Sequence, residues 1–173
     1  MALNKSEMGM RAIVDTNVMI VANGKAPQAS LSCQEECANK LLALQREGKI
    51  VLDDAWHILE EYGKNLQSSG QPGLGDAFYR WVLQNNSNPQ RCERYSITTD
   101  TKRDGNFLEF PSDARLNAFD PSDRKFVALA AVSSAPIWEA VDSDYWDHQA
   151  ALQENKIVVE FLCPDYFSSR TNS

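Results

Sequence analysis

The chain alternates between short apolar runs and longer segments in which apolar side chains recur every three to four residues. The short runs predict strands, which lie at the start of 12–22 and at 50–52, 94–98, 136–142 and 156–164. The periodic segments predict helices at 30–49, 55–66, 76–85, 120–132 and 148–155. A further short helix is expected at the end of 12–22.

Strands that alternate with helices favour a parallel sheet with helices on both faces. We therefore expect an α/β fold, a three-layer α/β/α sandwich whose central parallel sheet has four or five strands. One domain is expected over 10–166, with flexible ends at 1–9 and 167–173. Right-handed crossovers place the carboxyl ends of all the strands at one edge of such a sheet.

Polar residues mark where two of these helices begin. Asp54 is expected to cap the helix 55–66, whereas Asp53 before it is expected to serve the turn. Asp120 is expected to cap the helix 120–132, since Pro121 then takes the first helical position. Both assignments give an acid a purely structural role.

Composition narrows the class of protein. The 173 residues are enough for one packed domain, and the formal net charge of −7 argues against coating nucleic acid through charge alone. No apolar segment has the length of a membrane span or the form of a secretion signal. We expect a cytoplasmic protein without a membrane partner.

Cysteine usage points the same way. The four cysteines are Cys33, Cys37, Cys92 and Cys163, and the chain has two histidines. No CxxC pair occurs, which argues against a structural zinc site. Reduced thiols are the expectation for a cytosolic protein.

The stretch "AIVDTNVMI", residues 12–20, places a carboxylate inside an apolar run. A buried strand does not tolerate an unpaired acid, but the carboxyl end of a parallel strand faces the crevice where α/β proteins bind ligands. Asp142 and Asp144 follow another strand, and Asp123 lies in the first turn of a helix that begins at the same edge. These acids are therefore expected to converge on Asp15.

Converging carboxylates repel one another and favour a divalent cation between them. Mg²⁺ or Mn²⁺ prefers carboxylate oxygens, activates bound water and offsets charge on a phosphoryl group. A ligand set without histidine or thiolate suits phosphodiester hydrolysis better than peptide hydrolysis.

In their order along the chain, "IVDTNV", an acid in the helix after the second strand, "DPSDRKFVALA" and "AVDSDYW" resemble the PIN domain family. The resemblance covers nearly the whole chain. It implies a Mg²⁺- or Mn²⁺-dependent endoribonuclease that hydrolyses single-stranded RNA. Many members are toxins of toxin–antitoxin pairs, and many are dimers. The implied partners are therefore an antitoxin or other inhibitor protein and a second copy of the chain. RNA maturation and anti-phage defence fit the same chemistry.

The resemblance also implies roles for individual residues. The metal-binding and catalytic quartet would be Asp15, Glu61, Asp123 and Asp142. Asp144 is the candidate ligand of a second metal ion. The residues expected to support the ligands from behind are Thr16, Asn17 and Asp120. The residues expected to contact RNA phosphate are Arg124 and Lys125.

Two choices between neighbours stay open in the sequence. Glu61 is preferred over Glu60 because it lies nearer the apolar stripe of its helix. Asp123 is preferred over Asp120 as a ligand, although the helix start explains both acids. Tyr145 and Trp146 either stack on a base or belong to the core.

Other functions compete with the nuclease. A catalytically silent fold of the same kind would bind RNA or protein without cleaving. A phospho-aspartyl phosphatase of the haloacid dehalogenase type needs a second acid two residues after Asp15, where this chain has Asn17. A response-regulator receiver needs a phosphorylatable Asp and a distal Lys, and the pair Asp53–Asp54 offers no convincing equivalent.

Overall fold

Five parallel strands form the centre of the structure, a computed structural model that describes residues 9–170. The strands are β1 (Arg11–Val14), β2 (Lys49–Asp53), β3 (Cys92–Tyr95), β4 (Ile137–Glu139) and β5 (Val159–Phe161). Their order in the sheet is β3-β2-β1-β4-β5, and every neighbouring pair is parallel. The expected α/β class and the parallel sheet are confirmed.

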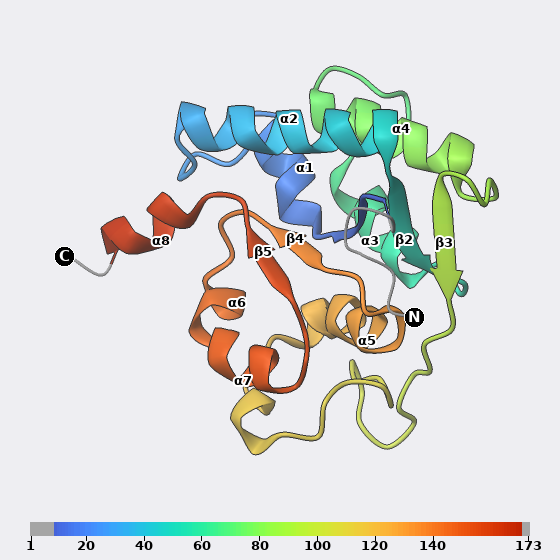
Figure 1. The fold of residues 1–173 in the computed structure, drawn as a ribbon, viewed down its shortest axis with the longest axis vertical. Helices are drawn as coiled ribbons and strands as arrows, with labels where there is room; N and C mark the ends of the chain where they lie inside the picture. The colour runs from blue at the N-terminus through green and yellow to red at the C-terminus, as the bar shows by residue number, and fades with distance from the viewer. Residues whose placement is uncertain (1–8, 171–173) are drawn as a thin grey trace.

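Helices cover both faces of the sheet and make the expected three layers (Figure 1). The helices before β4 are α1 (Thr16–Ala22), α2 (Leu31–Glu47), α3 (His57–Asn65), α4 (Leu74–Asn85) and α5 (Arg124–Ser133). Those after it are α6 (Ser143–Asp147), α7 (Gln149–Glu154) and α8 (Pro164–Arg170). Short 3₁₀ turns, η1 (Ala114–Leu116) and η2 (Pro121–Asp123), lie between β3 and α5. Helices α1, α2 and α4 pack together on one side of the sheet, and α5 crosses the other side.

The strand order creates a reversal point next to β1. The chain adds β2 and β3 on one side of β1, then returns to add β4 and β5 on the other. Open parallel sheets bind ligands beyond the carboxyl ends of the two strands that flank such a reversal. Here those strands are β1 and β4, whose register pairs Val14 with Trp138. The last residues of both strands are therefore neighbours.

The core around the sheet is built from buried apolar side chains. Ile13, Ile50 and Ile137 are fully buried on three adjacent strands, and Phe126 of α5 is also buried. The Tyr62 hydroxyl of α3 donates a 2.6 Å hydrogen bond to the carbonyl of Val14 and so attaches α3 to the end of β1. This bond fixes the helix that carries Glu61 against the strand that precedes Asp15.

Some elements differ from expectation at their ends. Strand β3 begins two residues earlier than predicted and ends at Tyr95. The N-cap residue of α3 is Trp56, and Asp53 rather than the expected Asp54 satisfies the start of the helix, with its carboxylate accepting from the backbone N–H groups of His57 and Ile58 at 2.9 and 3.0 Å. The predicted N-cap Asp120 is confirmed, with its carboxylate accepting from the backbone of Ser122.

The carboxyl-terminal segment is more ordered than expected. Helix α8 continues to Arg170, and Phe167, within the predicted flexible end, is buried and stacks on Trp146 with ring centroids 4.6 Å apart. The remaining parts of the two predicted flexible ends, 1–8 and 171–173, lie outside the described residues. Within the described part of the chain, no helix combines the length and apolarity needed to cross a membrane.

The cysteine expectation was wrong for two of the four residues. Cys33 and Cys163 form a disulfide across a sequence separation of 130 residues. Cys37 and Cys92 are free and buried, as reduced thiols. The sequence did not predict this disulfide, because Cys163 is brought next to α2 only by the position of β5 in the folded sheet.

Candidate functional site

Asp15 lies directly after β1, at the reversal point of the sheet. Its backbone N–H continues the pairing with β4 through a 3.0 Å bond to the Trp138 carbonyl. Its carboxylate caps α1 by accepting from the backbone N–H of Asn17 at 3.0 Å. The strand and the cap together hold the side chain in one orientation. Asp15 is also buried, with 3% of its surface exposed.

Two further carboxylates meet Asp15 there. Asp123 stands where the turn η2 passes into α5, and Asp142 caps α6 just after β4. One oxygen from each of the three side chains lies within 4.8 Å of the other two. Three segments that are far apart in the sequence thus supply one group of acids, which we call the carboxylate triad: Asp15, Asp123 and Asp142.

Burial and repulsion from neighbouring acids raise the pKa of Asp15 and of Asp123. Desolvation raises the pKa of Asp15 to about 7, and repulsion from Asp142 and Glu61 adds to the rise. Desolvation also raises the pKa of Asp123 to about 10, with repulsion from Asp15 and Asp142 adding to it. Acids held this close need protons or a cation to offset their charge.

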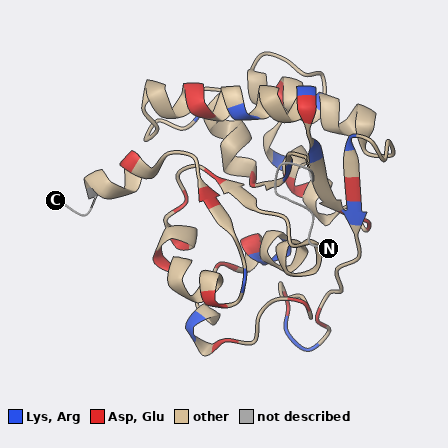
Figure 2. Cartoon of the chain, in the orientation of Figure 1, with Lys and Arg blue, Asp and Glu red and all other residues tan. Residues whose placement is uncertain are grey.

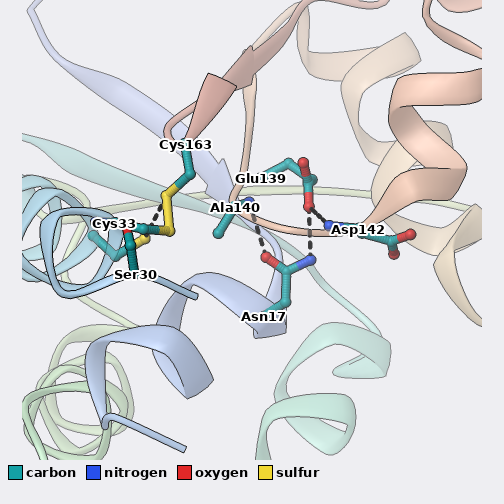
Figure 3. The surroundings of a disulfide bond; sticks show 8 residues. Asn17, Ser30, Cys33, Glu139, Ala140, Asp142 and Cys163 are labelled. Carbon is teal, nitrogen blue, oxygen red and sulfur yellow. Dashed lines mark hydrogen bonds between the residues drawn. A yellow bond between two sulfur atoms is a disulfide. The ribbon is translucent and has the colours of Figure 1, made fainter. Parts of the chain in front are cut away.

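A hydrogen-bonded bridge joins the two strand ends behind the triad (Figure 3). The Asn17 side-chain amide donates to Oε1 of Glu139 at 3.0 Å, and its carbonyl oxygen accepts from the Ala140 backbone N–H at 2.9 Å. The same Glu139 oxygen accepts from the backbone N–H of Asp142. The segment that begins with Asp15 is therefore tied to the turn that presents Asp142.

Glu139 is the residue that the sequence interpretation missed. It is fully buried on β4, and desolvation, with repulsion from Asp15, raises its pKa to about 9. Its second oxygen, Oε2, has no hydrogen-bond partner among the described residues. The signal was available, because an acid inside the apolar run "PIWEAV" is the same anomaly that drew attention to Asp15.

Glu61 lies beside the triad and is not part of it. Its carboxylate pairs with Lys125 at 2.9 Å and with Lys64 at 3.7 Å, and its charge contributes to the raised pKa of Asp15. Glu60, the alternative, is exposed to solvent. The fold thus favours Glu61 over Glu60 as the acid near the site, and it gives Lys125 a fixed partner there.

Asp144 also stands outside the triad. Its Oδ2 accepts from the backbone N–H of Asp120 at 2.8 Å, and its Oδ1 lies 3.2 Å from Nδ1 of His148. Burial raises the pKa of Asp144 above its ordinary value. The bond to Asp120 links the start of η2 to α6, so these two predicted site residues together brace the segments that carry Asp123 and Asp142.

The expectation that Arg124 contacts RNA phosphate is wrong. Its side chain is 3% exposed, and its guanidinium lies 4.5 Å from the centroid of the Phe110 ring. It donates to the backbone carbonyl groups of Leu116, Asn117 and Phe119 and to the side chain of Asn106. Arg124 therefore organises the loop before α5.

Of the two aromatic residues after β4, Tyr145 belongs to the core and Trp146 is partly buried. Tyr145 is fully buried close to Asp15, yet neither its hydroxyl nor Oδ2 of Asp15 completes a hydrogen bond with good geometry to a described residue. Trp146 packs against Phe161 and Phe167. The hydroxyl of Thr16 is likewise buried without a partner in the described part of the chain.

The buried unpartnered oxygens give a test of whether a cation fits. Oδ2 of Asp15 is buried close to the Tyr145 hydroxyl and has no hydrogen-bond partner of good geometry among the described residues. The donor set is all oxygen, the kind that Mg²⁺ and Mn²⁺ prefer. The residues of the triad could therefore hold such an ion, and Glu61 and Asp144 border the same place.

Among the described residues, lysines and arginines lie on many elements of the fold, and Figure 2 shows them scattered along the ribbon. Arg115, in the long connection, pairs with Asp113 and Glu154, both at 2.7 Å. Lys125 is the predicted cation that remains close to the acids.

Comparison with known proteins adds no identity to this geometry. No protein-family model matches the chain, and neither a curated protein nor a solved structure does so. The resemblance to the PIN domain stays a prediction from the ordered acids. The parallel sheet and the carboxylate triad at its reversal point are the observations on which a function can be argued.

Proposed function

We propose that this chain is a metal-dependent endoribonuclease that hydrolyses phosphodiester bonds of single-stranded RNA. The observation that carries the proposal is the convergence of Asp15, Asp123 and Asp142 within 4.8 Å at the reversal point of the sheet. The resemblance of the ordered acids to the PIN family supplies the substrate class. Mg²⁺ or Mn²⁺ is the proposed cofactor.

The triad would hold the ion, which when bound activates water and offsets charge on the phosphoryl group. Asp15 contributes a preset carboxylate, because its Oδ1 is fixed by the cap of α1 while Oδ2 remains unused. Asp123 is the N-cap residue of α5, but its side chain makes no capping hydrogen bond and so remains available to the other two acids. Asp144 is the proposed ligand for a second ion.

The residues around the triad would keep it in shape. Asn17 and Glu139 bridge the two strand ends, and Thr16 shares the buried side of the site. Asp120 braces Asp144 through its backbone. Contacts that are already in place would hold the carboxylates in position before substrate binds. Groups preorganised in this way stabilise the charge that develops in the transition state.

Lys125 is the proposed contact for an RNA phosphate. Its Nζ is held 2.9 Å from Glu61, and its side chain is 14% exposed. A lysine that is already ordered by a partner loses less conformational freedom when it binds an anion. Glu61 would then act by positioning Lys125 as well as through its own charge near the triad.

The proposed setting is the cytoplasm, where a nuclease of this kind would meet RNA. A toxin–antitoxin or defence role is proposed from the resemblance. An inhibitor protein that covers the reversal point and a second copy of the chain are the corresponding partners.

The first test is cleavage of an end-labelled pool of single-stranded RNA with Mn²⁺, with Mg²⁺ and with EDTA. We expect cutting with metal, none with EDTA and none by Asp15→Asn or Asp123→Asn. Glu60→Gln is the matched control, because Glu60 is exposed while its neighbour Glu61 faces the site; this variant should cut like the wild type.

A second measurement distinguishes a protein that has no metal site from one whose RNA target is missing from the pool. Calorimetric titration with Mn²⁺ should show binding by wild type and Glu60→Gln and a loss of binding in Asp123→Asn. Wild-type protein that neither cuts nor binds Mn²⁺ would refute the metal site. Binding of RNA without any cutting, with Mn²⁺ bound, would favour the catalytically silent RNA-binding module instead.

A further inference from the structure

Three of the four cysteines meet at one place, far from one another in sequence. Cys33 and Cys37 lie one turn apart on α2, and Cys163 follows β5 immediately before α8. The three Sγ atoms lie within 4.8 Å of one another. Figure 3 shows the bond between Cys33 and Cys163 next to the bridge of Asn17 and Glu139. We call these residues the cysteine cluster.

The separation of the third sulfur fits metal coordination. The Sγ atoms of Cys37 and Cys163 are 4.0 Å apart. In a tetrahedral zinc site with Zn–S bonds of about 2.3 Å, neighbouring sulfurs are about 3.8 Å apart. Once the bond from Cys33 to Cys163 is reduced, those two sulfurs also move apart to a non-bonded distance. The distance from Cys37 to Cys163 is thus already close to that spacing, and all three sulfurs lie within 4.8 Å of one another.

The surroundings leave a path for an ion and add negative charge. A pocket with a volume of about 230 Å³ opens onto Cys33 and Cys163, and Glu36 and Asp165 line it. Glu36 directly precedes Cys37 on α2, so a carboxylate stands at the opening from which an ion would reach the cluster.

We propose that the reduced chain binds one Zn²⁺ ion through Cys33, Cys37 and Cys163, with the fourth position open to the pocket that Glu36 lines. Tetrahedral coordination by three cysteines and one oxygen ligand suits this ion. The proposal is separate from the proposed nuclease activity, because it uses none of the residues of the carboxylate triad. The spacing of cysteines along the sequence concealed the site, since Cys163 is supplied by a segment remote from α2.

The ion and the disulfide are alternative states of the same residues. A dithiol reductant gives two electrons and two protons to the bond between Cys33 and Cys163, which yields two thiols and leaves the reductant as a disulfide. Zn²⁺ then replaces the three thiol protons of the cluster, which are released to solvent. A low-molecular-weight disulfide reverses the sequence: it takes two electrons from Cys33 and Cys163 and leaves as two thiols, and the restored bond removes two of the three sulfur ligands and releases the ion.

The test uses Co²⁺ as a coloured substitute for Zn²⁺. The full chain is reduced with a phosphine, freed of reductant under nitrogen and titrated with Co²⁺ while the thiolate-to-cobalt charge-transfer band is recorded. We expect the band to saturate at one equivalent and to disappear when one equivalent of Zn²⁺ is added. Oxidised protein should not give the band, although its carboxylates are unchanged.

Matched variants locate the ligands. Cys37→Ser leaves the disulfide pair intact and should lose the band after reduction. Cys92→Ser removes the other buried free thiol, on β3, and should keep it. Asp123→Asn should also keep it, which separates this site from the carboxylate triad.

Three results would overturn the proposal: no band in reduced wild type, an equal band in Cys37→Ser, or loss of the far-ultraviolet circular dichroism of the native fold on reduction. In the last case a native site for the ion would not exist.

Discussion

The side-chain amide of Asn17 donates a 3.0 Å hydrogen bond to the carboxyl group of Glu139, across the ends of two neighbouring strands. Asn17 comes two residues after Asp15, and Glu139 comes three residues before Asp142. The distance between two acids of the triad is thus set by a polar contact behind them.

Asn17→Ala should lower the free energy of unfolding by about 1–3 kcal/mol, because it leaves a buried Glu139 oxygen and the Ala140 N–H with fewer partners. Urea unfolding followed by tryptophan fluorescence measures the change. Asn117→Ala is the control, since Asn117 is exposed and offers only its backbone carbonyl to Arg124; its effect should stay within about 0.5 kcal/mol. Equal losses in the two variants would contradict the role given to the bridge.

Without metal, stability should fall as the pH rises from about 5 to about 9. The folded pKa values of Asp15, Glu139 and Asp123, about 7, 9 and 10, lie above their ordinary values. The unfolded chain therefore releases these protons near pH 4, whereas the folded chain keeps them, and each unit of separation corresponds to about 1.4 kcal/mol. This direction is opposite to that of a carboxylate stabilised by a salt bridge.

Glu139→Gln checks that sign. The amide has the size and neutrality of the protonated acid. Measured in EDTA, the free energy of unfolding of the variant should therefore fall less between pH 5 and pH 9 than that of wild type. Glu109→Gln, at a partly exposed acid whose carboxylate accepts from the backbone of Thr98, should keep the wild-type slope in that window. A Glu139→Gln profile parallel to wild type would show that Glu139 is not protonated in the folded chain.

The architecture could be predicted because its strands and helix starts depend on residues that are close together in the sequence. Apolar runs marked the strands, and Asp120 followed by Pro121 marked a helix start. Interactions between distant residues could not be predicted in this way. Whether Asp53 or Asp54 satisfies the start of α3 depends on how the backbone turns through Trp56, whose φ of 68° is left-handed.

The same limit applies to the site. Asp15, Asp123 and Asp142 could be named because each stands at an element end on the expected edge. The burial of Arg124 depends on a loop with no repeating pattern, which closes over its guanidinium. The bond from Cys33 to Cys163 depends on where β5 delivers its last residue.

Tyr62→Phe should destabilise the protein by about 1–2 kcal/mol, because it leaves the buried Val14 carbonyl without the 2.6 Å bond from the hydroxyl. Tyr79→Phe is the matched control. Tyr79 packs edge-on against Tyr62 with centroids 6.2 Å apart, but its hydroxyl forms no hydrogen bond recorded among the described residues. Thermal unfolding of the two variants side by side should separate them by several degrees.

Arg124→Met should lower the free energy of unfolding by about 2–4 kcal/mol, since several carbonyl groups lose their donor in the protein interior. Arg124→Lys should recover only part of this loss, because one ammonium group cannot reach the same set of acceptors. Arg103→Met, at an exposed arginine of the same connection, should leave stability nearly unchanged. Loss of RNA binding at unchanged stability in Arg124→Met would contradict the structural role.

Removal of one acid from the triad should have opposite effects with and without metal. In EDTA, Asp123→Asn should be more stable than wild type at pH 8, because folded wild type must keep on Asp123 a proton that the unfolded chain has released, whereas the amide is neutral in both states. With Mn²⁺ at about one hundred times its Kd, wild type should gain about 2.7 kcal/mol and the variant much less. Equal gains for both proteins would place the ion elsewhere.

The order in which a ribosome delivers the triad has a consequence of its own. Asp15 leaves the exit tunnel long before Asp142 and the strand β5 that lies beside β4. During that interval the nascent chain carries an incomplete set of acids and cannot assemble the group. Whatever chemistry the three carboxylates perform begins only after β4 and the turn beyond it have emerged and joined β1. For the proposed nuclease, this order would keep the growing chain from cutting the message that encodes it.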